Sequence, residues 1–97
     1  MKDNTKATLI YEERRELREG SFVEAVMWRL PQPTLGSEHP FKYRLALVMD
    51  GECVLRYDNE RGKGDHRHYG NREESYEFTT PEALFADFGA DARRLLK

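Results

Sequence analysis

Long apolar runs and cysteines are scarce in this chain of 97 residues. The longest apolar run extends from Leu45 to Met49, far short of the roughly 20 residues that a membrane-spanning helix needs. No apolar stretch follows Met1 to Asn4, so we expect no secretory signal. The single cysteine, Cys53, cannot form an internal disulfide, which is typical of proteins in a reducing compartment. These absences favour a cytoplasmic protein without a membrane segment.

The chain also has little net charge, because 16 lysines and arginines oppose 18 aspartates and glutamates. This balance argues against a general nucleic-acid coat protein but is compatible with a local cationic site. The sequence has no internal repeat and no low-complexity tract, and a chain of this length buries only about two-thirds of its unfolded surface. We therefore expect one α+β domain over residues 1–97, with a single antiparallel sheet of about 4–6 strands packed by a C-terminal helix.

Turn residues divide the chain into its expected strands. Glu19-Gly20 and Asp50-Gly51 mark hairpin turns, because glycine adopts the positive φ that tight turns require. Pro31, Pro33 and Pro40 mark a loop between the hairpins, since proline cannot donate to a hydrogen-bond ladder. The expected strands are Ala7–Leu17, Ser21–Leu30, Phe41–Met49, Cys53–Asn59, His66–Tyr69 and Ser75–Phe78.

Parity along the first hairpin predicts which side chains share a face. Leu9, Tyr11 and Leu17 have one parity on the first strand. The residues that share one parity on the second strand are Phe22, Val26, Trp28 and Leu30.

The last element has the clearest signal. Thr80 is a good N-cap, Pro81 suits the first helical position, and Glu82 complements the positive end of the helix dipole. Apolar side chains then recur at helical spacing, namely Leu84, Phe85, Phe88, Ala92, Leu95 and Leu96.

The register of the central hairpin decides which face is free for chemistry. The apolar sets are Phe41, Tyr43, Leu45, Leu47 and Met49 on one strand and Cys53, Leu55 and Tyr57 on the next. They share a face only if residues of equal parity pair, which requires an odd loop such as Asp50-Gly51-Glu52. A two-residue loop would bury Arg56 and Asp58 among the leucines, at a high cost in free energy.

In the odd register the opposite face is cationic. It carries Lys42, Arg44, Arg56 and Asp58, and Arg44 lies directly across from Asp58. Surface ion pairs add only about 0–1 kcal/mol each, so stability alone explains this cluster poorly.

Two histidines follow two residues apart. In a strand, His66 and His68 point to the same side, next to Arg44 and Asp58. Lys63 lies between two glycines, on a loop whose backbone can approach a ligand closely. Gly62-Lys63-Gly64 is not a P-loop, because its spacing and the residue after the lysine are wrong.

These residue types suit metal-independent cleavage of RNA. One histidine would take the proton of the ribose 2′-hydroxyl, and the other histidine or Tyr57 would protonate the leaving 5′-oxygen. The expected cations for the developing charge are Arg44, Lys63 and Arg67, and Asp58 or Asp65 could orient an imidazole. The expected RNA contacts are Lys42, Tyr43, Arg56, Asn59 and Arg61. No metal or other cofactor is expected in this interpretation.

Three other interpretations stay open. His-x-His with Asp58 or Asp65 could form a three-ligand metal site, although the nearby cations would repel a divalent ion. The cationic face could hold RNA or an acidic antitoxin segment without chemistry. The histidines could also be solvated loop residues that support a turn.

Several motifs resemble the TumE family of toxins from prokaryotic toxin–antitoxin systems. They are Phe41-Lys42-Tyr43-Arg44-Leu45, Arg56-Tyr57-Asp58-Asn59 and Gly62-Lys63-Gly64-Asp65-His66-Arg67-His68, with Trp28-Arg29-Leu30-Pro31 before them and Phe78-Thr79-Thr80-Pro81-Glu82 after them. The resemblance spans nearly the whole chain. It implies a cytoplasmic type II toxin that a helix-turn-helix antitoxin neutralises by direct binding. Exposed strand edges in so small a sheet need cover, so we expect a homodimer or an antitoxin contact.

Overall fold

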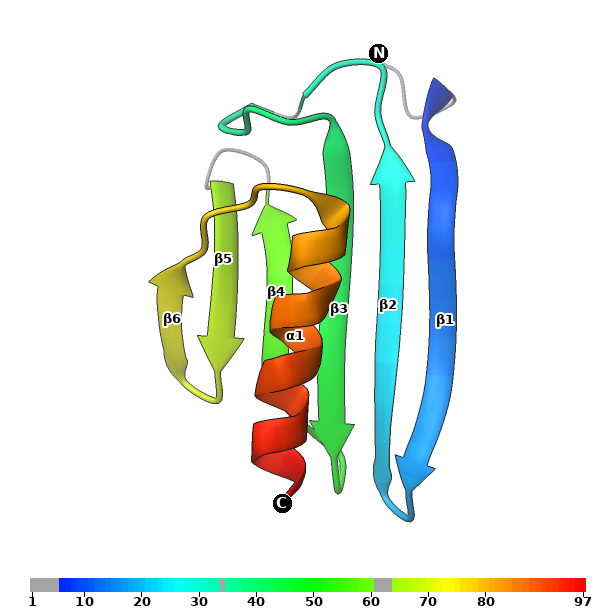
Figure 1. The fold of residues 1–97 in the computed structure, drawn as a ribbon, viewed down its shortest axis with the longest axis vertical. Coiled ribbons are helices and arrows are strands. Elements are labelled where there is room, and N and C mark those ends of the chain that lie inside the picture. The colour runs from blue at the N-terminus through cyan, green and yellow to red at the C-terminus, as the bar shows by residue number, and fades with distance from the viewer. Residues whose placement is uncertain (1–5, 34, 61–63) are drawn as a thin grey trace.

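The computed structural model describes residues 6–33, 35–60 and 64–97 and shows one antiparallel sheet covered by one helix (Figure 1). Six strands pair in sequence order. They are β1 (Thr8–Arg18), β2 (Ser21–Arg29), β3 (Phe41–Met49), β4 (Glu52–Glu60), β5 (Gly64–Tyr69) and β6 (Arg72–Ser75), and helix α1 (Pro81–Leu96) follows them. The predicted α+β class is confirmed. Within the described residues, no helix is long and apolar enough to cross a membrane.

Helix α1 begins where its sequence signals predict. The side chain of Thr80 accepts a hydrogen bond from the backbone N–H of Ala83 at 3.0 Å, and Pro81 opens the first turn. The helix crosses in front of β4 (Figure 1) and buries Leu84, Phe88 and Ala92. Its apolar stripe therefore closes one face of the sheet, as expected from the helical spacing.

The two faces of the sheet differ in cover, and we call them the helix face and the open face. The helix face carries the core, which contains Met27, Tyr43, Leu45, Leu47, Leu55 and Tyr57 packed against α1. The open face carries the residues between them, including Arg44, which pairs with Asp58 as predicted. In β2 the core residue Met27 pairs with Tyr43, so the set Phe22, Val26 and Trp28 lies on the open face.

The turn of the central hairpin differs from the prediction. The loop has two residues, Asp50 and Gly51, both with positive φ (52° and 83°), which matches the twist of the flanking strands. The equal-parity register arises instead from a β-bulge in β4, where Val54 is the extra residue between the pairs Val48–Cys53 and Leu47–Leu55. Cys53, expected with the core residues, lies before the bulge and is exposed.

Bulges also alter the prediction for β1. Leu9 pairs with Trp28 and Tyr11 pairs with Met27, because the register shifts between Leu9 and Tyr11. The two side chains therefore lie on opposite faces, and their predicted common face is wrong. A second shift falls between Glu16 and Arg18, so parity does not extend to Leu17 either.

Candidate functional site

Two rows of polar side chains cross the open face on four neighbouring strands. In one row, Arg44 pairs with Asp58, Asp58 with His66, and His66 with Ser75. In the next row, Arg56 pairs with His68 and His68 with Glu73. Because directly paired residues project to the same face, the strand register brings these side chains together. We call Arg44, Arg56, Asp58, His66, His68 and Glu73 the open-face cluster.

The two imidazoles of the cluster lie close enough to act on one small group. Their ring centroids are 6.4 Å apart, and the side chains of His66 and His68 are 15% and 21% exposed. His66 Nε2 lies 3.4 Å from Glu73 Oε2, and His68 Nε2 lies 3.8 Å from Asp58 Oδ1. Each ring thus lies near a carboxylate and is still accessible to solvent.

The contact between Arg56 and His68 has a defined donor and acceptor. Arg56 Nη2 lies 3.1 Å from His68 Nε2. A guanidinium has no acceptor, so in this contact Arg56 donates and Nε2 of His68 accepts. His66 Nε2 faces the Glu73 carboxylate at ion-pair distance, without a hydrogen bond in good geometry. The two histidines therefore differ, because Nε2 of His68 faces a guanidinium and Nε2 of His66 faces a carboxylate.

Arg56 and Asp58 support the cluster from β4. Arg56 Nε lies 3.1 Å from Asp58 Oδ2. This buried nitrogen has no hydrogen-bond acceptor in good geometry among the described residues, so the contact is an ion pair only. The Arg56 side chain as a whole is one-third exposed.

Two predicted catalytic residues lie on the other face. Tyr57 is fully buried, and its hydroxyl donates to Asp91 of α1. Arg67 donates to Glu74 at 2.6 Å and to the Tyr57 hydroxyl at 3.2 Å. Burial and the hydrogen bond to Asp91 raise the pKa of Tyr57 well above its ordinary value. The structure thus separates both residues from the histidines by the thickness of the sheet.

Two predicted RNA contacts are also structural. Tyr43 and Asn59 are both 2% exposed, so neither side chain reaches an RNA surface. Asn59 Oδ1 accepts from the Tyr43 N–H at 3.0 Å, and Asn59 Nδ2 donates to the Phe41 carbonyl at 2.6 Å. Lys42 is tied to the same place, since its Nζ donates to the Asn59 carbonyl at 3.2 Å. Arg61 and Lys63 lie outside the described residues.

Asp65 orients an imidazole, but not one of the predicted pair. Its Oδ2 lies 2.9 Å from His39 Nε2 and accepts from the Tyr43 hydroxyl at 2.6 Å. His39 Nδ1 accepts from the Phe41 N–H at 3.2 Å, and its ring stacks on Phe78. This arrangement fixes the neutral Nε2–H tautomer and holds the proline-containing loop against the sheet.

The histidine-metal interpretation has little support in this geometry. Asp65 lies on the helix face with His39, away from His66 and His68. Asp58, the other candidate ligand, is ion-paired with Arg56. Among the described residues, no group of three or more histidine, cysteine or acidic side chains is arranged to hold a metal ion.

The sequence analysis missed three residues that contact the predicted site residues, namely Glu73, Asp91 and His39. Glu73 was missed because the last strand was placed at Ser75–Phe78, whereas β6 ends at Ser75. Asp91 had a signal, since it is one charged residue within the apolar helical stripe and three residues after Phe88. His39 had none, because its partner is 26 residues away.

One of the comparisons with known proteins identifies a family for the chain. A family model described as Toxin TumE matches residues 3–96. No curated protein and no solved structure matches the chain. Because the family match covers nearly all of the sequence, including every strand and the helix, the chain belongs to the TumE toxin family.

Proposed function

We propose that this TumE-family toxin is a metal-independent endoribonuclease whose base and acid are His68 and His66. The observation that carries the proposal is the pair of partly exposed imidazoles with centroids 6.4 Å apart, one with its Nε2 at a guanidinium and one with its Nε2 at a carboxylate. A general base or acid acts over a heavy-atom distance of about 2.6–3.2 Å. Two rings at this separation can therefore reach opposite sides of one phosphate.

The reaction is transphosphorylation at the ribose. When the phosphate binds, Arg56 turns from His68 Nε2 to the phosphate oxygens. The freed Nε2 takes the proton of the 2′-hydroxyl, and the 2′-oxygen forms a bond to phosphorus. The bond from phosphorus to the 5′-oxygen breaks, and His66 gives its proton to that oxygen. The products are a 2′,3′-cyclic phosphate and a 5′-hydroxyl, and no metal or other cofactor enters the balance.

The arginines of the open-face cluster stabilise the negative charge of the reacting phosphate. Arg56 is already in contact with His68, so a phosphate bound between the rings would meet a guanidinium at once. Arg44 is exposed one strand away, opposite Asp58, and supplies a second positive charge. Fixed cations stabilise the charge that develops on the phosphorane, which is typically a large contribution to catalysis. Glu73 faces the His66 ring from β6 and would favour its protonated form.

The toxin family implies an antitoxin partner, and we infer one that binds the folded toxin directly. The proposed type is a helix-turn-helix antitoxin of a type II system, encoded next to the toxin and acting in the cytoplasm. A small reading frame of that kind beside the gene, whose product suppresses growth inhibition and copurifies with the toxin, would support this part. RNA cleavage tests the other part separately.

The decisive test of the chemistry is cleavage of single-stranded RNA by purified protein in EDTA. We expect products with 2′,3′-cyclic phosphate ends. His66→Gln and His68→Gln keep a polar side chain but cannot exchange a proton near neutral pH, and each should lower the rate about 10²- to 10⁴-fold. Arg14→Gln is the matched control, because Arg14 is an exposed open-face arginine paired with Glu24 in the outer strands.

Each competing interpretation gives a different result in the same assay. If both glutamine variants retained the wild-type rate, the histidine mechanism would be wrong. Activity that disappears in EDTA and returns with zinc would show a metal-dependent hydrolase. Salt-sensitive RNA binding without product in any buffer would show a binding module, with a salt dependence that weakens in Arg44→Gln.

A further inference from the structure

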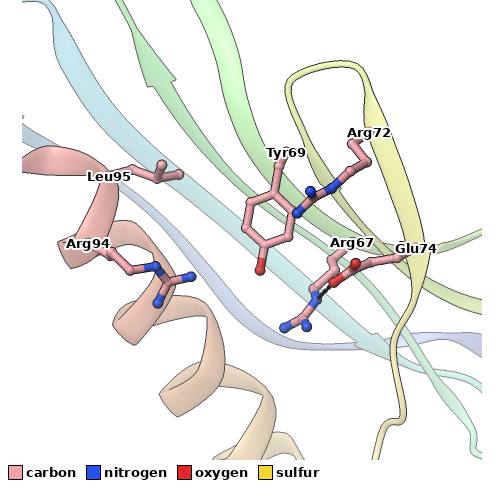
Figure 2. Close-up of a pocket in the computed structure, with 6 residues that line it drawn as sticks. All are labelled: Arg67, Tyr69, Arg72, Glu74, Arg94 and Leu95. Atoms are coloured by element: carbon pink, nitrogen blue, oxygen red, sulfur yellow. Dashed lines mark hydrogen bonds and ion pairs between the residues drawn. The ribbon is translucent and has the colours of Figure 1, made fainter.

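A pocket of about 500 Å³ lies on the helix face, between the second half of α1 and the strands β5 and β6. Its lining residues are Arg67, Tyr69, Arg72, Glu74, Arg94 and Leu95. Figure 2 shows the three arginines arranged around the ring of Tyr69, with Arg94 reaching across from the helix. The pocket is separate from the open-face cluster, because Arg67 and Tyr69 alternate with His66 and His68 along β5.

Two of the three arginines already have carboxylate partners. Arg67 Nε donates to Glu74 at 2.6 Å, and Arg67 Nη1 lies 3.6 Å from Asp91. Arg94 donates to Asp91, which also accepts from the Tyr69 hydroxyl at 2.8 Å. Three guanidinium groups and two carboxylates leave the pocket with one positive charge in excess.

Arg72 carries the excess charge. Its guanidinium carbon lies 5.4 Å from the centre of the Tyr69 ring, a cation–π contact that leaves its N–H groups free to donate. Within residues 6–33, 35–60 and 64–97, no carboxylate is ion-paired with Arg72. A planar guanidinium held in place by an aromatic ring is well suited to bidentate recognition of a carboxylate.

We propose that this pocket binds an acidic side chain of an extended partner-protein segment that lies along the edge of β6. The single excess charge matches one carboxylate, whereas Glu74 and Asp91 would repel a polyphosphate chain. Tyr69 and Leu95 give the pocket an apolar part that suits peptide side chains better than a ribose–phosphate backbone.

The position of β6 in the sheet supports a strand-like ligand. It is the last strand in the sheet order, so its outer backbone groups are available to pair with an added strand. Arg72 and Glu74 of this strand point to the pocket side, while Glu73 faces the histidines. A strand added here would place alternate side chains into the pocket. An antitoxin is the partner class that the toxin family implies, and the inference does not depend on the proposed nuclease chemistry.

The test is titration of the full-length protein with a blocked pentapeptide of alternating leucine and glutamate, followed by NMR. We expect shifts of the backbone amides from Arg72 to Ser75, and no binding of the peptide with glutamine in place of glutamate. Arg72→Gln should weaken binding at least about threefold. Arg93→Gln is the matched control, because Arg93 is exposed on the same helix but does not line the pocket.

Two results would overturn the proposal. One is peptide binding that does not change in Arg72→Gln or that does not distinguish glutamate from glutamine. The other is a short single-stranded RNA that shifts the same amides while the peptide does not. The His66→Gln, His68→Gln double variant should bind the peptide as the wild type does, and Arg72→Gln should cleave RNA normally. The peptide-binding assay and the RNA-cleavage assay therefore test the two proposals separately, and either proposal can fail while the other holds.

Discussion

At the residue scale, Asn59 shows how one side chain completes the hydrogen bonding of a sheet. The regular pairing of β3 with β4 ends at Arg44 and Asp58. One position further, the Asn59 amide occupies both the Tyr43 N–H and the Phe41 carbonyl. These two side-chain hydrogen bonds therefore replace backbone hydrogen bonds that β4 does not make to β3 at this position. Because its polar atoms are paired in this way, Asn59 can be buried, with 2% of its surface exposed.

We predict that Asn59→Ala lowers the free energy of unfolding by about 2–4 kcal/mol, because it leaves a buried donor and a buried acceptor without partners. Urea denaturation at pH 7 measures the change. Asn71→Ala, in the exposed turn between β5 and β6, should cost less than about 0.5 kcal/mol. Equal costs for the two variants would contradict the structural role.

Asp91 connects three side chains beneath the helix. Burial tends to raise the pKa of its carboxyl, but hydrogen bonds from Tyr57, Tyr69 and Arg94 outweigh burial and lower the pKa below its ordinary value of 3.8. A carboxyl whose pKa is lower in the folded state stabilises the protein above the unfolded pKa. That contribution is lost as the pH falls through the folded pKa.

We predict that Asp91→Asn destabilises the protein by about 1–3 kcal/mol at pH 7, and that the difference from the wild type shrinks below about pH 4. Denaturant titrations at pH 7, 5 and 3 test both statements. Asp87→Asn serves as the comparison, since Asp87 is exposed and accepts one hydrogen bond, from Tyr76 at 2.6 Å. A difference that grows on acidification would show that the sign is wrong.

The alternation of residues along the strands already predicted which of the candidate side chains share a face. Alternation along a strand already places Arg67 on the face opposite to its neighbours His66 and His68. The same rule places Tyr57 opposite to Asp58. The sequence prediction nevertheless grouped all five, because it gave charge and residue type more weight than parity. The pair of histidines beside Asp58 followed from parity alone and is the part that the structure places together.

At the element scale, the two hairpin turns at one end of the sheet support each other. The Asp50 N–H donates to the Gly20 carbonyl at 2.7 Å. Gly20 and Gly51 have nearly equal positive φ values of 82° and 83°. A Cβ on Gly20 would lie 2.7 Å from Asp50 Oδ1, whereas a Cβ on Gly51 would meet no atom within 4 Å. Both glycines are thus needed for their positive φ, and Gly20 is also needed because a Cβ there would clash with the Asp50 side chain.

We predict that Gly51→Ala costs about 1 kcal/mol of unfolding free energy, for the backbone conformation alone. Gly20→Ala should cost about 0.5 kcal/mol more, because the Asp50 carboxylate must rotate away. Thermal denaturation of both variants, each in the wild-type and in the Asp50→Gly background, separates the backbone cost from the clash with Asp50. The extra cost of Gly20→Ala should vanish when residue 50 is glycine. An extra cost that persisted there would assign it to something other than the Asp50 side chain.

Local signals predicted the elements unequally. The cap at Thr80 and the helical spacing after it located α1 correctly, because both signals lie within the helix itself. The bulges in β1 and β4 could not be located, since a bulge depends on how a strand meets its neighbour. The short strand β6 was placed too late because Tyr76 and Phe78 look like strand residues, whereas they contact Asp87 and His39 from an irregular segment.

At the scale of the whole molecule, burial is distributed unevenly across the sheet. Strand β1 is an edge strand with nearly every residue exposed, while β3 and β4 carry most of the buried core. Native-state stability follows the density of buried apolar contacts, so local opening should begin at β1.

We predict that hydrogen exchange under native conditions gives the highest opening free energies at Leu45, Leu47 and Leu55. The opening free energies of the hydrogen-bonded amides of β1 should be lower than these by about 2 kcal/mol or more. Exchange measured amide by amide by NMR checks this order. A uniform opening free energy across all six strands would mean that the sheet opens only as one unit.

The bulge at Val54 has a consequence for how this chain can change over generations. Deletion of Val54 would remove the bulge and keep the pairs Leu47–Leu55 and Arg44–Asp58. One residue inserted after Leu55 would instead turn the rest of β4 over, so that Arg56 and Asp58 would enter the interior and Tyr57 would face water. Most amino-acid exchanges at the outward positions of this strand leave its pleat intact. Selection can therefore shorten β4 by one residue at the bulge, but it cannot lengthen the strand beyond the bulge without exchanging its two faces.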